Sequence, residues 1–216
     1  MPPNKTELLV LLALAVLALV VSGIGPTDRM TWWLEVLPVL IAIPLLLATW
    51  RVFPLTPLLY RLIFLHALIL MLGGHYTYAQ VPLGFWVQDA LDLSRNHYDR
   101  LGHVAQGFEP AILAREILLR RSPLKRGGWL FLYVTSVCLA FSAFFEMFEW
   151  WVSLASGAAG DAFLATQGDP WDTQWDMFLA LVGAIAAQLL LARLHDRQLA
   201  RLVPPAPSMD PKTGMK

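Results

Sequence analysis

The chain has 216 residues, of which 57% are hydrophobic and only 15% are charged. A soluble domain seldom reaches this apolar share, so the composition favours a membrane protein. The net charge is zero, which gives no reason to expect a nucleic-acid partner. The single cysteine, Cys138, excludes both an intrachain disulfide and a zinc site built from cysteines.

Five segments are apolar and long enough to cross a bilayer, for which roughly 20 mostly apolar residues are needed. The first segment is followed by a stretch without a small-x-small cleavage pattern, so we interpret it as an anchor and not as a signal peptide. The second contains Pro38 and Pro44, which membrane helices tolerate when neighbouring groups satisfy the freed carbonyls. The five predicted spans are about 8–24, 33–50, 57–73, 129–151 and 171–194.

A further helix is predicted over 99–120 although this segment carries several charged side chains. Its roughly 22 residues would rise about 33 Å, which is enough to cross. It can span only if other helices surround it, because polar groups that face lipid are too costly. Glu109 and Pro110 predict an interruption of this helix at mid-depth. The segment 81–95 is predicted to contain a short amphipathic helix at the interface, and the glycine pairs at 73–74 and 127–128 predict turns.

Together these segments predict an all-α, polytopic membrane helix bundle with about six transmembrane helices plus a short interfacial segment. Residues 1–203 are expected to form one bundle domain, and the proline-rich tail 204–216 is expected to be disordered. Cytoplasmic loops carry an excess of Lys and Arg. If both termini are cytoplasmic, only Arg29, Arg95 and Arg100 of the 16 Lys and Arg residues lie outside. We therefore expect a multi-pass protein of the bacterial inner membrane with both termini in the cytoplasm.

This topology brings polar residues from several helices to one depth, just below the outer surface. Residues three or four positions apart share a helix face. Three such pairs lie near the outer ends of predicted helices: Asp99 and His103, Glu146 and Glu149, and Asp172 and Asp176. His75 follows the third span on the same side. We therefore predict a shared polar site at the outer rim.

The charge of this predicted site needs compensation. A carboxylate costs roughly 2.5–3.5 kcal/mol at the centre of a membrane and less near the interface. Protons, water or a bound cation must therefore offset several neighbouring acids, unless these acids are simply solvated at the interface or interact with helix dipoles. Histidine and carboxylate ligands favour Zn²⁺, Mn²⁺ or Fe²⁺ over Mg²⁺ or Ca²⁺. The predicted metal ligands are His75, Asp99, His103, Glu146 and Asp172; the candidate catalytic residues are Glu149 and Asp176; the supporting residues are Arg100, Tyr76 and Gln174.

Two stretches, "NHYDRLGH" and "GDPWDTQWDMFLALVGA", resemble the YjdF family of bacterial inner-membrane proteins. The resemblance extends over nearly the whole chain, from "GGHYTYAQVPLG" through "REILLR" to the last helix. That family has no established biochemical function. The resemblance therefore implies an inner-membrane location without a mechanism.

The sequence is more distantly similar to VanZ-like proteins. Their pattern opens one helix with an aspartate, a basic residue, two spacers and a histidine, and it continues with acids in the following helices. The positions that match it are Asp99, Arg100, His103, Glu146 or Glu149, Asp172, Asp176 and Gly183. The family's asparagine four residues past the last aspartate is Ala180 in this chain. VanZ-like proteins are linked to resistance against glycopeptide antibiotics of the teicoplanin type, so this similarity implies a setting among cell-envelope lipids.

The leading hypothesis from the sequence is an intramembrane metal-dependent hydrolase or transferase that acts on a lipid-linked or amphiphilic envelope substrate. A bound metal would activate a water molecule, a spare carboxylate would act as the base, and segment 81–95 would gate the site. One alternative is an ion- or proton-coupled transporter, for which His66, Gln106 and Glu109 are the polar residues at mid-depth. Another is a non-catalytic membrane protein that binds a lipid head group through a bridging cation.

Overall fold

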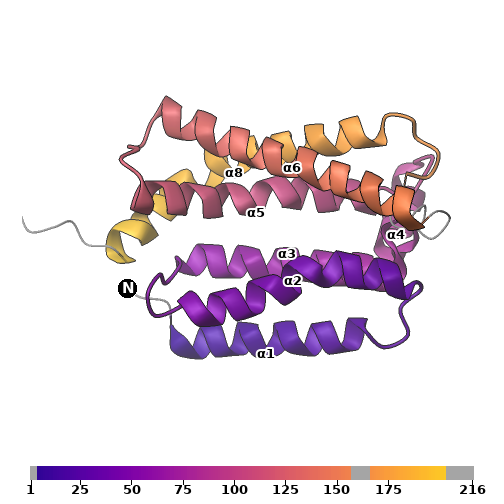
Figure 1. The fold of residues 1–216 in the computed structure, drawn as a ribbon, viewed down its shortest axis with the longest axis horizontal. Helices are drawn as coiled ribbons and strands as arrows, with labels where there is room; N and C mark the ends of the chain where they lie inside the picture. The colour runs from indigo at the N-terminus through magenta and orange to yellow at the C-terminus, as the bar shows by residue number, and fades with distance from the viewer. Residues whose placement is uncertain (1–3, 157–165, 203–216) are drawn as a thin grey trace, which may run out of the picture.

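The structure is a computed structural model that describes residues 4–156 and 166–202. Within these residues the chain forms seven α-helices, one short 3₁₀ helix and no strand. The long helices run lengthwise in two layers, one of α1, α2 and α3 and the other of α5, α6 and α8 (Figure 1). This confirms the predicted all-α bundle, while the predicted disordered tail 204–216 lies outside the described residues.

The bounds of the helices agree with the predicted segments to within a few residues, apart from the last two spans, which extend further at their C-terminal ends. The first layer consists of α1 (Lys5–Ser22), α2 (Arg29–Thr49) and α3 (Pro57–Tyr76). The 3₁₀ helix η1 (Tyr78–Gln80) and the short α4 (Pro82–Leu91) follow. The second layer consists of α5 (Tyr98–Arg121), α6 (Gly128–Ser156) and α8 (Asp172–Leu202).

Five helices, namely α1, α2, α3, α6 and α8, are long and apolar enough to cross a membrane. The more polar α5 lies at the centre of the molecule, where it packs against α3, α6 and, most extensively, α8. Four of its ionisable residues are buried, namely His103, Glu109, Arg115 and Glu116. The surrounding helices therefore supply the cover that the sequence requires for a polar helix of this length.

The predicted interruption of the polar helix at Glu109 and Pro110 is wrong, because α5 runs unbroken from Tyr98 to Arg121. Proline removes one backbone donor, so this helix loses only the hydrogen bond to the carbonyl of Gln106. Packing on three sides of α5 maintains the helix across this point. The glycine pair at 73–74 is also not a turn, since both residues lie within α3.

Two glycines allow α5 and α8 to approach each other closely. A Cβ atom on Gly107 would lie 1.8 Å from the carbonyl oxygen of Ala180, and one on Gly183 would lie 2.2 Å from that of Val104. No side chain fits at either position, so the two backbones are in direct contact. This contact fixes how far α5 and α8 are shifted along each other. It therefore also fixes the relative positions of the polar residues that the two helices carry near their ends.

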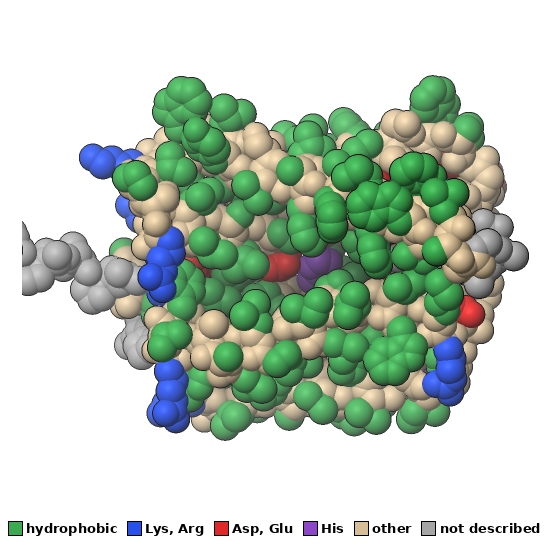
Figure 2. Space-filling model, in the orientation of Figure 1, with side chains coloured by type: hydrophobic (Ala, Val, Ile, Leu, Met, Phe, Trp, Pro, Cys, Tyr) green, Lys and Arg blue, Asp and Glu red, His purple; other side chains and the backbone are tan. Residues whose placement is uncertain are grey.

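The two ends of the bundle differ. α4 lies at one end, and the first residue of α1 and the last turns of α8 lie at the other (Figure 1). We call these the α4 end and the terminal end. Hydrophobic side chains cover the length between them, and Lys and Arg side chains gather mainly at the terminal end of the face that Figure 2 shows. The α4 end carries the candidate site.

Candidate functional site

Helices α2, α5, α6 and α8 place six ionisable side chains close together at the α4 end. Each helix contributes residues that lie toward the α4 end of that helix. Five of the six side chains are buried, and that of Asp99 is partly exposed. We call this group the polar cluster; its members are Glu35, Asp99, His103, Glu146, Glu149 and Asp176.

His103 lies at the centre of the polar cluster. Its Nε2 atom is 3.5 Å from Oδ1 of Asp99 and 3.8 Å from Oδ1 of Asp176. On the other edge of the ring, Nδ1 is 3.7 Å from Oε1 of Glu146 and 3.1 Å from Oε1 of Gln106. The imidazole therefore separates two carboxylates on its Nε2 side from one on its Nδ1 side.

The contact with Gln106 determines which ring nitrogen can bind a cation. An amide oxygen only accepts, so Nδ1 of His103 must donate the proton of this hydrogen bond. In the neutral ring Nε2 then presents its lone pair to the two aspartates. In that tautomer Nε2 and the two carboxylate oxygens are atoms of the kind that a divalent cation binds, and the amide orients the imidazole ring.

The distances fit a small divalent cation. One ligand atom from each of Asp99, His103 and Asp176 lies within 4.8 Å of the other two. Ligand atoms around a tetrahedral Zn²⁺ ion with bonds of about 2.0–2.1 Å are roughly 3.3 Å apart. The separations of 3.5 and 3.8 Å from Nε2 are close to this value, so small side-chain shifts would complete the coordination.

Unpaired buried oxygens show that the polar cluster is not internally satisfied. Oε1 of Glu146 and Oδ1 of Asp176 are buried and have no hydrogen-bond partner within the described residues. Buried polar atoms are normally paired, and an unpaired one indicates strain, a catalytic role or a bound ion or water. The polar cluster therefore has free acceptors on both sides of His103.

Glu149 and Glu35 complete the polar cluster, and both lie within electrostatic reach of His103 and Asp99. Glu149 is buried, and its charged neighbours are Glu146, His103, Asp99 and Glu35. Glu35 is likewise buried and bonds to the side chain of Tyr78. Three glutamates thus lie beside the imidazole without a salt bridge to Lys or Arg in the described part of the chain.

Sequence reasoning missed Glu35 and Tyr78. The signal that points to them is the set of small residues around Tyr78: a Cβ on Gly73 or Gly102 would lie 2.3 Å or 2.7 Å from its ring. The ring is therefore held between α3 and α5. Gly74 brings α3 against the Cβ atom of Glu35 in the same way. The glycine pair of α3 makes room for this tyrosine and this glutamate.

An arginine pair borders the polar cluster at the α4 end. Arg95 bonds to Asp172, with 2.8 Å between Nη2 and Oδ1, and both Arg95 and Arg100 contact Oδ2 of Asp169 at 3.3 Å. Asp172, a predicted ligand, is therefore neutralised by Arg95 at the rim. Burial and the positive charges of Arg100 and Arg95 lower the pKa of His97, which precedes α5.

Three other predicted residues do not reach the polar cluster. His75 directs Nδ1 to the carbonyl oxygen of Ser22 at 2.8 Å, and its ring contacts that of Tyr76. Gln174 is exposed and borders a hollow of about 460 Å³ on the outside of α8, together with Trp171, Trp175 and Phe178. Of the predicted ligands, the structure thus brings together Asp99, His103 and Glu146, joined by the predicted catalytic residues Glu149 and Asp176.

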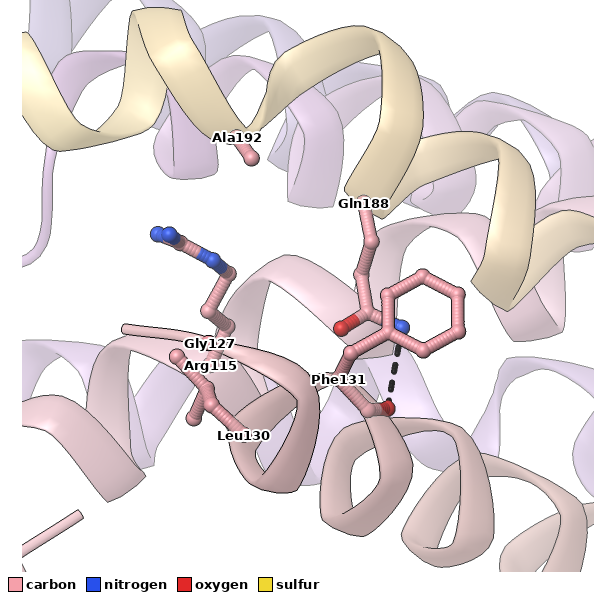
Figure 3. Close-up of a pocket in the computed structure, with 6 residues that line it drawn as sticks. All are labelled: Arg115, Gly127, Leu130, Phe131, Gln188 and Ala192. Carbon is pink, nitrogen blue, oxygen red and sulfur yellow. Dashed lines mark hydrogen bonds between the residues drawn. The ribbon is translucent and has the colours of Figure 1, made fainter. Parts of the chain in front are cut away.

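A second hollow lies toward the terminal end, between α5, α6 and α8 (Figure 3). Its volume is about 150 Å³, and the guanidinium group of Arg115 and the amide of Gln188 border it. The amide nitrogen of Gln188 donates to the carbonyl oxygen of Phe131 at 3.5 Å, and Arg115 is bound to His195 and Asp196. This hollow belongs to a different, internally paired network.

Comparison with known proteins gives two matches. Residues 7–197 match the family described as "Predicted membrane protein (DUF2238)". The chain is also 57% identical over 185 residues to the inner membrane protein YjdF of Escherichia coli strain K12, covering 86% of this chain and 88% of the relative. No solved structure matches the chain. The polar cluster therefore lies within a region that is shared with inner-membrane proteins.

Proposed function

The chain belongs to the DUF2238 family of predicted membrane proteins, and we propose that in this setting it is a metal-dependent hydrolase or transferase of the inner membrane. The observation that carries the proposal is the group of three ligand atoms from Asp99, His103 and Asp176 within 4.8 Å, beside unpaired buried carboxylate oxygens. Burying several acids inside a membrane protein is costly unless their negative charge is compensated. A bound cation would compensate it.

We further propose that the α4 end faces the periplasm and the terminal end the cytoplasm. The terminal end holds the basic loop between α5 and α6 and the last turns of α8, where Lys and Arg are frequent. Excess Lys and Arg mark the cytoplasmic side. The substrate would then approach the polar cluster from the outer leaflet.

The proposed chemistry divides the polar cluster by function. Asp99, His103 and Asp176 would hold the cation, which would supply a Lewis acid and a water molecule of lowered pKa. Glu149 would act as the general base, since it is buried beside the group and lies outside the ligand trio. Asp176, predicted as a catalytic residue, is assigned to the ligands because of its distance to His103.

The substrate is proposed to be lipid-linked or amphiphilic. The polar cluster is buried close to one end of the spans, and most side chains on the face that Figure 2 shows are hydrophobic. The hollow bordered by Trp171, Trp175 and Phe178 lies at the start of α8, one turn or less from Asp172 and Asp176 along the chain. An acyl or isoprenoid chain could rest there while the polar group of the substrate reaches the site. The similarity to VanZ-like proteins stays a prediction.

Metal analysis tests the proposal. The purified protein, exposed to Zn²⁺, Mn²⁺ or Fe²⁺ and then desalted, should retain about one ion per chain, as expected for a three-ligand site with an open position. His103→Ala should lose the ion because it removes the central ligand. His75→Ala is the matched control, since this histidine bonds to Ser22 outside the cluster, and it should retain the ion. No retention by the unmodified protein, or equal retention by His103→Ala, would reject the metal site.

A further inference from the structure

A second ionisable pair lies at the middle of the bundle, apart from the polar cluster. Nδ1 of His66 is 3.2 Å from Oε2 of Glu109, and their side chains are only 13% and 12% exposed. Glu109 is the twelfth residue of the 24-residue α5, and His66 is the tenth of the 20-residue α3. Each is therefore roughly 15 Å from either end of its helix. The pair lies at the depth where an ionisable group is most costly in a membrane.

The pair has spare hydrogen-bonding capacity. Nε2 of His66 and Oε1 of Glu109 are both buried and have no partner within the described residues. The charged and titratable groups that face the pair are few: α6 presents Cys138, and α8 meets α5 at this depth through Ala180 and Gly183. If the imidazole of His66 is neutral and the carboxylate of Glu109 is ionised, the pair carries one uncompensated negative charge in the hydrocarbon layer. One shared proton makes it neutral.

Polar atoms extend from this pair toward the polar cluster along α5. His103, Gln106 and Glu109 follow one another at intervals of three residues, so each is a neighbour of the one before on the helix surface, and His103 is bonded to Gln106. Because Pro110 lacks a backbone donor, the carbonyl of Gln106 is not needed within the helix. The amide side chain of Gln106 thus lies between the two titratable sites along α5.

Helix α6 carries a matching line of polar atoms. Cys138, Ser142 and Glu146 follow one another at intervals of four residues, all buried on one face. Cys138 lies beside Glu109, and Glu146 lies beside His103. The hydroxyl of Ser142, between them, is fully buried and has no partner within the described residues. A buried hydroxyl is normally paired, so an unpaired one at this point leaves room for a bound water molecule between the two sites.

On the other side of the pair the interior is apolar. Ile112 lies one turn beyond Glu109, Val134 one turn beyond Cys138, and Leu59 two turns beyond His66, and each of the three is fully buried. The next acid along α5, Glu116, is about 10 Å further on. Polar side chains therefore connect the pair of His66 and Glu109 to the polar cluster, whereas buried apolar side chains separate the pair from the terminal end.

We propose that His66 and Glu109 form a proton-binding site at the middle of the membrane, which exchanges protons with the polar cluster and not with the terminal end. A proton passes from the carboxyl group of Glu146 to Glu109 through the hydroxyl of Ser142 and hydrogen-bonded water, each of which accepts one proton as it gives up another, and it returns by the same route. The amide of Gln106 lines this route and does not itself transfer the proton. The pair stores a proton for the chemistry at the α4 end and does not conduct protons across the membrane.

Labelling with a membrane-permeable carbodiimide tests this proposal, because the reagent attacks protonated carboxyl groups in apolar surroundings. The full-length protein is labelled in right-side-out and in inverted membrane vesicles with the pH set separately on each side, and peptide mass spectrometry locates the label. Labelling of Glu109 should follow the pH on the side that bears α4. It should decrease as the pH on that side is raised and stay constant when only the pH on the terminal side changes.

Two variants make the test specific. Glu109→Gln keeps the shape of the side chain and should remove the label from that peptide, leaving labels elsewhere unchanged. Ser142→Ala should slow the response of Glu109 labelling to a jump in pH on the α4 side, because it removes the hydroxyl on the path. Labelling that follows the pH on the terminal side, or that ignores the pH on both sides, would overturn the proposal. The metal content of the polar cluster is a separate readout, so the failure of one proposal leaves the other testable.

Discussion

Glu116 and His195, at the terminal end, show what a fully satisfied buried pair looks like in this protein. Oε2 of Glu116 accepts hydrogen bonds from the backbone and hydroxyl of Thr56 and from His195, and Oε1 accepts one from Arg120. Arg115 donates to Nδ1 of His195, so Nε2 carries the proton that His195 donates to Glu116. Complete pairing indicates a structural role, whereas the polar cluster keeps unpaired oxygens.

Glu116→Gln is predicted to destabilise the protein by about 3 kcal/mol, since removing one partner from a buried, hydrogen-bonded charge network leaves the others unpaired. Unfolding in mixed detergent micelles measures the change. Glu7→Gln is the control: its pair with Arg61 is largely exposed, and such pairs contribute less than about 1 kcal/mol. Equal losses for both variants would contradict a structural role of the buried network.

At the residue scale the sequence predicts much of the candidate site. Asp99 with His103 and Glu146 with Glu149 share faces by helical spacing alone, and the structure places all four in the cluster. Glu35 could not be found in this way, because nothing within α2 shows that Gly74 brings α3 against it.

At the scale of the elements, the contact between α5 and α8 determines the position of the site. It depends on Gly107 and Gly183, whose missing side chains let the two backbones touch. Close backbone approach at small residues is the usual way in which membrane helices associate, because the hydrophobic effect gives no preference for helix over lipid. Asp176 on α8 reaches His103 on α5 only at this helix separation.

Gly107→Ala is predicted to cost about 3 kcal/mol of stability, because the new Cβ would overlap the backbone of Ala180 and force the helices apart. It should also reduce metal retention through the displaced Asp176. Thermal unfolding in detergent measures the first effect. At Gly128 an added Cβ meets no atom within 4 Å, so Gly128→Ala should leave the stability unchanged. A loss at Gly128 as large as at Gly107 would show that the effect is not due to the contact.

At the scale of the whole molecule, the two layers meet where α3 packs on α5, and the mid-membrane pair His66 and Glu109 lies in this seam. The α4 end holds the polar cluster with its unpaired oxygens, bordered by the pairs that Arg95 and Arg100 form. At the terminal end the buried acid of α5 is paired and basic residues are frequent. This polarity along the bundle follows the proposed orientation, with chemistry at the periplasmic end and anchoring at the cytoplasmic end.

The orientation is tested with single cysteines. In a Cys138→Ala background, Asp92→Cys should react with a membrane-impermeant maleimide added to intact spheroplasts, because residue 92 follows α4 and is exposed. Lys125→Cys, in the loop between α5 and α6, should react only after the membrane is permeabilised. The opposite labelling pattern would reverse the orientation and place the polar cluster on the cytoplasmic side.

The helices could be located from local sequence, because the length and apolar character of a span are local properties that the bilayer requires. The break at Glu109 and Pro110 that local sequence also predicts does not occur. Local sequence also determined which acids share a helix face, since helical spacing is fixed. Packing between helices places Glu35 and Tyr78 beside His103, keeps His75 away from it, and bonds Glu109 to His66. The physical reason is that rotation and height of each helix are set by contacts between residues far apart in the chain, such as Gly107 against Ala180, and no local pattern encodes these contacts.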